Sequence, residues 1–238
     1  MTCTPFKLYQ KLFSYFGEQN WWPTDLSYHK KYQSDPRFEI IIGAILTQNT
    51  AWTNVEKALQ QLKQHNIMTI KALVSIDENH LKKLIQPSGF FNQKAQRLKH
   101  IAQYLYTNYH ADLDLFFTRD EKILRQELLS LQGIGPETAD SILLYAGNKP
   151  FFVIDAYTKR IAKRIPFQIG DTDTYDTFQN FFQTELKKET QPKQRVLLYQ
   201  EFHALLVELA KNFCRKKPLC QSCPVHKLCT YPNSQAYL

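Results

Sequence analysis

Four of the chain's five cysteines lie close together near its C-terminal end, in the spacing C-x5-C-x2-C-x5-C. This clustering argues against a disulfide framework, whose cysteines are spread along a chain. Thiolates are soft metal ligands, and four of them in one loop can surround a single metal centre. The loop is therefore predicted to fold around a metal, with the ligands Cys214, Cys220, Cys223 and Cys229.

The spacing also bears on which metal centre the loop holds. Structural zinc sites more often combine two short C-x2–4-C pairs, whereas here only Cys220 and Cys223 form a short pair. The five-residue spacings on either side of this pair favour a larger group, a [4Fe–4S] cluster, and zinc is the alternative. His226 lies inside the loop and is expected at the surface, because four thiolates already complete a ligand set. We assign no role to Cys3.

The spacing of apolar residues predicts helices along most of the chain. Glycine makes up about 3% of the residues, against a usual ~7%, so few tight left-handed turns are available. Apolar residues recur every three or four positions in the segments 38–46, 55–62 and 196–209. Asp35 followed by Pro36 is typical of a helix start. One strand-like run, 151–154, is too short to force a sheet, so the predicted fold class is all-α.

Two further helix starts are predicted from capping boxes, in which a hydroxyl residue precedes a glutamate by three positions. Ser75 stands in this relation to Glu78, and Thr118 to Glu121. The chain contains neither an internal repeat nor a low-complexity linker. Any domain boundary is therefore expected inside a short loop.

The charge of the chain points to a polyanionic partner. Lysine and arginine number 30 against 22 acidic residues, for a formal net charge of +8. Nucleic acid is the first candidate for such a partner and an anionic membrane surface the second. The sequence has no run of 18 apolar residues and no signal-peptide pattern, so we expect an intracellular protein that does not span a membrane.

Two of the chain's seven glycines occur together in a turn between two predicted helices, 119–129 and 137–146. Glycines permit a tight turn and close approach of the backbone, and amides at the start of the following helix can bind an anion. Helix, G-x-G hairpin and helix is the signature of a helix-hairpin-helix motif that binds phosphates without reading sequence. The predicted phosphate-binding residues are Gly133, Ile134, Gly135 and Thr138.

Asp155 ends the apolar run 151–154. A carboxylate in this position has to be hydrogen-bonded, because burial without a partner is costly. Asp155 is also placed to cap a helix beginning at Ala156. The two roles are compatible, since a capping carboxylate stays ionised and oriented.

The hairpin, the aspartate after a short apolar run and the four-cysteine loop, in this order and spacing, resemble the endonuclease III superfamily of DNA glycosylases. The resemblance runs from about residue 38 to residue 229. It implies that Asp155 is the catalytic aspartate. It also implies that Gln48, in the segment 46–50, fills the gap left in DNA by a flipped base.

The same resemblance implies two all-α lobes with a DNA-binding groove between them. A six-helix lobe with the helix-hairpin-helix motif is expected at 38–149. The second lobe is expected to combine 1–37 with 150–238, including the cluster loop at about 214–229. Duplex DNA containing a damaged base is the implied partner, and a groove-binding glycosylase is expected to act as a monomer.

Glu137 departs from the family's bifunctional members, which carry a lysine at this position of the hairpin motif. Without an amine there is no Schiff base, and the strand is not cut by β-elimination from this site. Lys149, Lys159 and Lys163 are near in sequence, but none occupies the position. We therefore expect a monofunctional, hydrolytic DNA N-glycosylase.

Trp21 and Trp22, followed by Pro23, are candidates for the wall of a base pocket. Aromatic rings together with the Glu137 carboxylate suit a cation, and N3- or N7-alkylated purines carry a positive charge. With the L-T-Q-N-T segment, these residues resemble the 3-methyladenine branch of the superfamily. The alternative is that the two tryptophans only anchor the N-terminal segment, and Trp52 is expected in the core more than in a pocket.

The sequence thus predicts a base-excision-repair enzyme for alkylated purines, cytoplasmic and associated with the nucleoid. Two alternatives stay open. One is a glycosylase with lyase activity on oxidised pyrimidines, which would need an amine outside the family position. The other is a non-catalytic DNA-binding protein that retains the hairpin and the metal loop.

Overall fold

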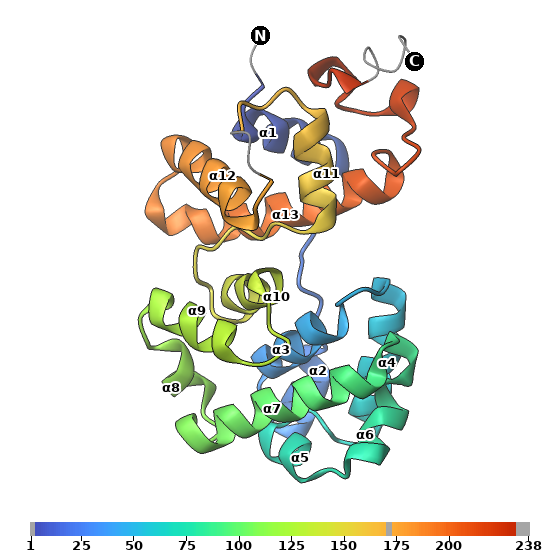
Figure 1. The fold of residues 1–238 in the computed structure, drawn as a ribbon, viewed down its shortest axis with the longest axis vertical. Helices are drawn as coiled ribbons and strands as arrows, with labels where there is room; N and C mark the ends of the chain where they lie inside the picture. Colours follow the sequence, from blue (N-terminus) through green and yellow to red (C-terminus); the bar gives the residue numbers. More distant parts are fainter. Residues whose placement is uncertain (1–2, 170–172, 232–238) are drawn as a thin grey trace. The chain divides into compact units, whose positions relative to one another are not determined.

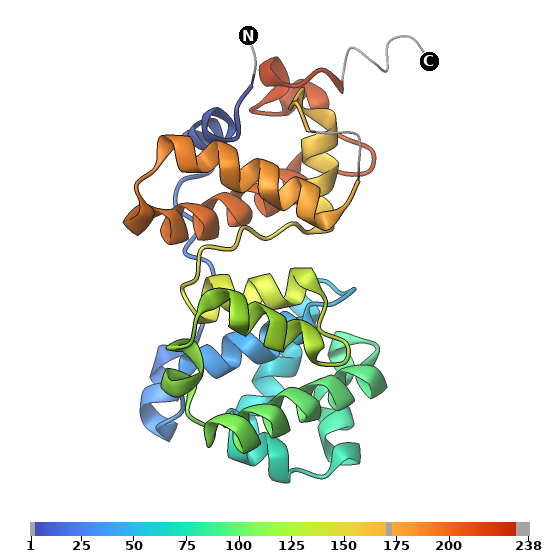
Figure 2. The same ribbon diagram turned by 60° about the vertical axis from the view of Figure 1, so that its left-hand side comes forward.

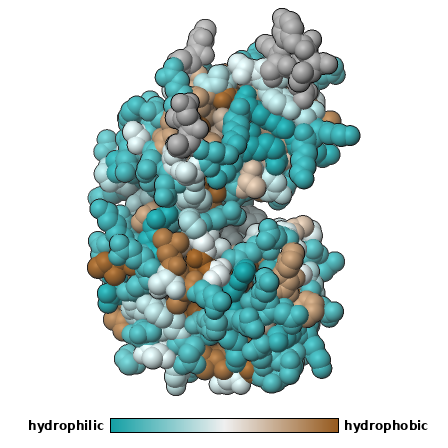
Figure 3. Space-filling model, viewed as in Figure 1, coloured by the Kyte–Doolittle hydropathy of each residue, from teal (hydrophilic) through white to brown (hydrophobic). Residues whose placement is uncertain are grey.

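The computed structural model describes residues 3–169 and 173–231 of the chain. Every regular element within these residues is a helix, which confirms the all-α prediction. None of these helices is long and apolar enough to cross a bilayer. The face seen in Figure 3 is mostly hydrophilic, in keeping with a chain in which 22% of residues are charged.

The chain folds into two compact units, a continuous unit, Trp22–Lys149, and a discontinuous unit that joins Met1–Trp21 to Pro150–Leu238. The first boundary therefore falls between residues 21 and 22, whereas the sequence predicts it between 37 and 38. The difference lies in α2 (Leu26–Tyr32), whose buried His29 Nε2 is 2.6 Å from Glu39 Oε2 on α3 (Pro36–Leu46). This buried contact ties the segment 22–37 to the helices that follow it.

Helix α3 forms the centre of the continuous unit, and each of its residues from Phe38 to Leu46 is buried. It packs against α4, α7, α10 and η2 (Figure 1). The remaining helices of this unit are α4 (Trp52–Gln64), α5 (Ile70–Ser75), α6 (Glu78–Ile85), η1 (Gln86–Ser88), α7 (Phe91–Tyr109), α8 (Leu113–Phe117), α9 (Glu121–Ser130), α10 (Pro136–Ser141) and η2 (Ile142–Ala146).

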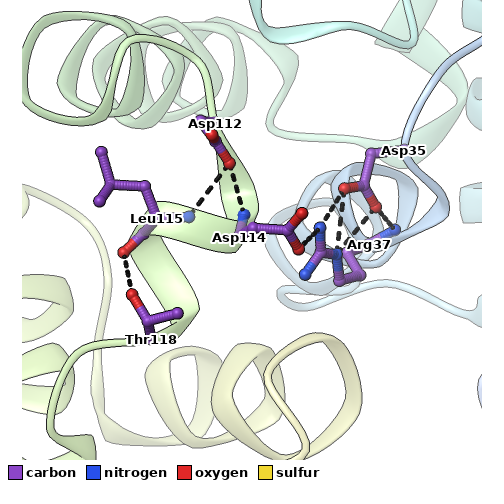
Figure 4. Close-up of polar contacts among 6 residues, drawn as sticks. All are labelled: Asp35, Arg37, Asp112, Asp114, Leu115 and Thr118. Carbon is purple, nitrogen blue, oxygen red and sulfur yellow. Dashed lines mark hydrogen bonds and ion pairs between the residues drawn. The ribbon is translucent and has the colours of Figure 1, made fainter.

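Aspartates rather than hydroxyl residues begin several of these helices. Asp35 caps α3 as predicted, its Oδ1 accepting from the Arg37 amide at 2.8 Å. In Figure 4 the Arg37 guanidinium also joins this carboxylate to that of Asp114, at 2.8 Å, on α8. This ion pair links the start of α3 to a helix nearly 80 positions away, but exposed pairs of this kind add little stability.

The two predicted capping boxes are wrong by two residues. Asp77 caps α6 and Asp120 caps α9, because a carboxylate two positions downstream is the better acceptor at a helix N-terminus. Ser75 ends α5 instead, where its hydroxyl donates to the Lys71 carbonyl at 3.0 Å. The Thr118 hydroxyl likewise donates backwards, to the Leu115 carbonyl at 2.9 Å (Figure 4).

In the discontinuous unit, α1 and α11 both pack against α13 (Figures 1 and 2). The apolar pattern at 196–209 falls on α13, although its Leu197 is 70% exposed. The helices of this unit are α1 (Pro5–Phe16), α11 (Ala156–Arg164), α12 (Tyr175–Glu189), η3 (Pro192–Gln194), α13 (Arg195–Asn212), η4 (Cys220–Ser222) and η5 (His226–Leu228).

The apolar run 151–154 is a buried extended segment without a strand partner among the described residues. Its backbone is satisfied by side chains of α12: the Phe152 amide donates to Gln183 Oε1 at 3.0 Å, and its carbonyl accepts from Gln179 Nε2 at 2.9 Å. The Phe152 ring stacks on Phe182 with centroids 4.9 Å apart. These contacts hold the segment that leads directly into Asp155.

Candidate functional site

The glycine hairpin lies between α9 and α10, as predicted, and α10 continues into the single π-helical turn η2. Gly133 has a φ of +84°, in the left-handed region that favours glycine. Gly135 is the N-cap of α10 and Pro136 its first residue. Ile134 is only 5% exposed, so it anchors the turn while the glycines on either side are exposed.

Gln48 lies directly against this hairpin. Its Nε2 donates to the Gly133 carbonyl at 3.0 Å and to Thr138 Oγ1 at 2.9 Å. Its Oε1 accepts a hydrogen bond from Arg97 Nη1 on α7. Gln48, Gly133 and Thr138, all predicted to contact DNA, are thus brought together. The sequence analysis did not identify Arg97, because the sequence shows only that it lies on a helix.

Lys94, one turn before Arg97 on α7, is fully buried. Its Nζ donates to the Leu46 carbonyl at 2.8 Å and to the Ser88 carbonyl at 2.7 Å, which joins the end of α3 to η1. Burial lowers the pKa of Lys94 to about 8, and the nearby charge of Arg97 acts in the same direction. A buried amine therefore holds the backbone that leads into Gln48.

Phe90, at the start of α7, is a second residue that the sequence analysis did not identify. It is 62% exposed and its φ is +46°, a conformation that costs a bulky residue energy. Its only sequence signal is two adjacent phenylalanines after Gly89, and this pattern is equally typical of a core.

Asp155 caps α11 as predicted, with its Oδ1 accepting from the Thr158 amide at 2.6 Å. Its side chain is 13% exposed, and its Oδ2 lies 3.8 Å from His203 Nε2 on α13. Burial by itself raises the pKa of this carboxyl, but the nearby His203 and the hydrogen bond from the Thr158 amide outweigh it, so the pKa lies below its ordinary value. Asp155 is therefore ionised at neutral pH.

His203 is the group near Asp155 that the sequence analysis missed. It stands within the apolar pattern of α13, beside Phe202, and is 8% exposed. A lone histidine among apolar residues is usual for a protein core, so its sequence carried no signal. Only the packing of α11 against α13 brings it to the aspartate, 48 positions earlier in the chain.

Trp22 contributes to an aromatic cluster in the continuous unit. Its ring centroid lies 5.3 Å from that of Trp52 and 5.3 Å from that of Tyr145 on η2. Gly43 of α3 makes room for the ring, since a Cβ there would lie 2.9 Å from it. Trp52 is half-buried and forms part of this cluster.

Trp21 and Glu137 are the other two predicted pocket residues. Trp21 belongs to the discontinuous unit, where it lines a hollow together with Phe13, Glu18 and neighbouring residues of α1 and α13. Glu137 is exposed, in the first turn of α10 of the continuous unit. The adjacent tryptophans therefore enter different units, at the point where the chain passes from one to the other.

The four cysteines of the C-terminal loop line one pocket, as the spacing predicts, and its other walls include apolar residues of α11 and α13. Among the described residues, no three cysteine, histidine or acidic side chains come close enough together to hold a single metal ion. Burial raises the pKa of Cys223 to about 11 and also raises that of Cys229. These thiols need a cationic centre to become thiolates.

Two arginines of α11 hold this loop in place. Arg164 Nη1 donates to Cys214 Sγ at 3.2 Å and to the Arg215 carbonyl at 2.7 Å. Arg160 Nε donates to the Cys214 carbonyl at 2.9 Å. Because α11 begins at Asp155, one short helix connects the candidate catalytic carboxylate to the candidate metal loop.

The chain is similar to known proteins in sequence and in fold. Residues 42–188 match the family described as HhH-GPD superfamily base excision DNA repair protein. A relative from Methanocaldococcus jannaschii, described as a putative DNA repair glycosylase, is 44% identical over 94% of this chain and 94% of its own length. The structure of H. pylori 3-methyladenine DNA glycosylase (MagIII) bound to 1,N6-ethenoadenine is 28% identical, with a TM-score of 0.70 over 88% of this chain and 98% of that one. An endonuclease III–DNA complex has a TM-score of 0.71 at 18% identity, over 100% of each chain, and so shares the fold.

Proposed function

The chain belongs to the HhH-GPD superfamily of base excision DNA repair proteins, and from this premise we propose that it hydrolyses the N-glycosidic bond of an alkylated purine in duplex DNA. It is a DNA glycosylase. The proposal adds the lesion, a 3-methyladenine-like base, and the absence of strand cutting. The observation that carries the hydrolytic chemistry is Asp155, an ionised, oriented and nearly buried carboxylate.

Asp155 acts chiefly through its charge. A carboxylate whose pKa is lowered takes up a proton poorly, so it is a weak general base. It is well suited to stabilise the positive charge that develops on the sugar as the base departs, and to orient the attacking water. Its bond to the Thr158 amide fixes one oxygen and leaves Oδ2 on the side of His203.

Glu137 accounts for the proposed lack of lyase activity. A carboxylate in the first turn of α10 cannot attack the sugar to form a Schiff base. The lysines near Asp155 do not supply the missing amine at this position: Lys163 pairs with Asp173 at 2.5 Å, and Lys159 lies on α11 with it.

The preference for an alkylated purine rests on aromatic rings and negative charge. Trp22 and Tyr145 pack edge to face, with ring centroids 5.3 Å apart, in the unit that also carries the Glu137 carboxylate. Rings and a carboxylate attract a cationic base through cation–π and charge interactions. The 28% identical 3-methyladenine DNA glycosylase of H. pylori is consistent with this class of lesion.

DNA binding is proposed to use the hairpin and the residues around it. The turn around exposed Gly133 and Gly135, with Ile134 and Thr138 beside them, binds a backbone phosphate at the start of α10. Gln48 occupies the space of the flipped nucleotide, and Phe90, which is 62% exposed, inserts between bases. An enzyme of chromosomal DNA works inside the cell, and we propose a nucleoid-associated monomer.

The four cysteines are proposed to hold a [4Fe–4S] cluster, which relatives of the endonuclease III type typically carry. The loop fits such a group because its four thiols line one pocket. When bound, the cluster cross-links the loop to itself. Arg164 then offers a hydrogen bond to the Cys214 sulfur.

The test is base release. Purified protein is incubated with methylated duplex DNA and the released bases are identified by mass spectrometry, with borohydride added to a parallel reaction to trap any Schiff base. The proposal predicts free 3-methyladenine, no trapped adduct and no strand nicking. Thymine glycol excision with nicking would instead select the lyase alternative, and no base release at all would select a non-catalytic DNA-binding protein.

A further inference from the structure

Every hydrogen-bonding atom of the Gln48 amide is engaged within the continuous unit. Its two N–H groups donate to the Gly133 carbonyl and to Thr138 Oγ1, and its carbonyl oxygen accepts from Arg97. Free glutamine side chains on a surface sample many rotamers, and ordering one costs entropy. The Gln48 side chain is already ordered in the folded protein, so DNA binding does not have to order it.

Arg97 is built into the hairpin as well as bonded to Gln48. A Cβ on Gly133 would lie within 2.7 Å of the Arg97 Cγ and Cδ atoms, so the arginine stem occupies the space that the glycine leaves open. Lys94, on the same helix, holds the Leu46 carbonyl two residues before Gln48. The backbone and the side chain of Gln48 are thus both positioned from α7.

We propose that Arg97 is a positioning residue that holds Gln48 on the hairpin in the orientation used to fill the gap in DNA. This inference rests on the proposed function, in which Gln48 takes the place of the flipped nucleotide. The Gly133 turn that binds a phosphate and the amide that fills the gap then form one rigid surface. Recognition of an extrahelical nucleotide is thereby coupled to backbone binding.

A simple phosphate contact by Arg97 would have a different consequence. A residue that only neutralises a phosphate weakens binding to all duplexes equally when removed and lowers the salt dependence by about one charge. A residue that positions Gln48 lowers the preference for DNA with a missing base and leaves binding to intact DNA largely unchanged. The ratio of the dissociation constants for intact DNA and for DNA with a missing base therefore distinguishes the two roles.

The experiment measures this ratio by fluorescence anisotropy, with a duplex carrying one tetrahydrofuran abasic-site analogue and the same duplex intact. Arg97→Met keeps the stem that packs on Gly133 and removes the guanidinium. It is expected to lower the preference for the abasic duplex roughly 10-fold, because losing a hydrogen bond to a charged group usually has an effect of this size. The same loss is expected for Gln48→Ala. Because the two residues act as one, the double variant is expected to lose no more than either single variant.

Arg119→Met is the matched control, since Arg119 is a 47% exposed arginine of the same unit that pairs with Glu127 at 3.3 Å. It is expected to change both dissociation constants by the same factor. A second pair of variants leaves the charge untouched: Thr138→Val removes the hydroxyl that accepts from Gln48 and should lower the preference, whereas Thr138→Ser should restore it. If Arg97→Met does not fold, as judged by circular dichroism, Arg97→Gln takes its place, because it also removes the guanidinium and should lower the preference in the same way.

Three results would overturn the inference. The first is an equal loss of affinity for both duplexes in Arg97→Met. The second is a gain of affinity of this variant for the abasic duplex, which would mean that Arg97 restrains Gln48 from inserting. The third is a loss in the double variant that equals the sum of the two single losses. If wild type has the preference and Gln48→Ala removes it but Arg97→Met does not, this inference alone fails. If wild type shows no preference for the abasic duplex, the proposed role in base excision fails with it.

Discussion

Replacing Asp155 by asparagine separates the charge of this carboxylate from its structural role. The amide oxygen of asparagine can still accept the Thr158 N–H bond, 2.6 Å long in the structure, and asparagine is about as good an N-cap as aspartate. The fold should therefore persist, with the free energy of unfolding changed by about 1 kcal/mol or less. The negative charge facing the sugar is lost.

The size of the kinetic effect follows from that charge. Two unit charges about 4 Å apart interact by about 4 kcal/mol at an effective dielectric constant near 20. Loss of this stabilisation from the transition state slows base release by roughly 1,000-fold. The carboxylate lies 13% exposed at the end of a buried segment, so bulk solvent screens it only in part.

The assay is single-turnover release of labelled 3-methyladenine, with DNA binding measured in parallel by anisotropy. Asp155→Asn should bind DNA as tightly as wild type, since no phosphate contact is removed. The matched control is Asp173→Asn, which removes an exposed carboxylate of the same unit and should release base at the wild-type rate. A rate for Asp155→Asn within a few-fold of wild type would refute the assignment.

The pH dependence gives an independent check on Asp155. Its pKa in the folded protein lies below the ordinary value of 3.8, so the ionised form is complete at neutral pH. Its contribution, to activity and to stability alike, is lost only as pH falls through that lowered pKa. Base release by wild type should therefore show no loss attributable to Asp155 between pH 7 and about pH 5.

Three further predictions concern the hairpin, the buried lysine and the cysteine loop. Gly133→Ala should reduce DNA affinity and lower the free energy of unfolding in urea by about 2 kcal/mol, because the φ of Gly133 is +84°. Gly135→Ala should unfold almost as wild type does, because Gly135 has a negative φ and no atom lies near the position of an added Cβ. Equal stability of the two variants would contradict this reasoning. The pKa of Lys94 falls from 10.5 to about 8 on folding, so between these pH values the native state binds fewer protons than the unfolded state. Wild type should therefore gain about 2 kcal/mol in its free energy of unfolding between pH 7 and 9.5, relative to Lys94→Met. A difference between the two proteins that does not change with pH would disprove the shift. Cys223→Ser should lower the iron bound per chain in elemental analysis while Cys3→Ser should not, and stoichiometric zinc in wild type would contradict a cluster.

Local interactions account for what could be predicted from the sequence. Helix stripes, the caps at Asp35 and Asp155 and the glycine turn all depend on residues within a few positions of one another. The cysteine ligand set is also local, because its four members share one loop. Where two local signals competed, as at Ser75 and Asp77, the stronger acceptor began the helix.

Tertiary structure decided which distant groups meet. Arg97 reaches Gln48 across 49 positions, and His203 lies near Asp155 only because α11 packs on α13. The side-chain amides that satisfy the 151–154 backbone come from α12, so no sheet is needed there.

The sequence by itself determined an all-α chain with a hairpin, a capping aspartate and a loop that gathers four cysteines, because each depends on short-range geometry. Tertiary structure alone assigned the adjacent tryptophans to different units and placed Arg97 on Gln48. Such contacts depend on how whole helices pack, and residue spacing along the chain carries no record of them.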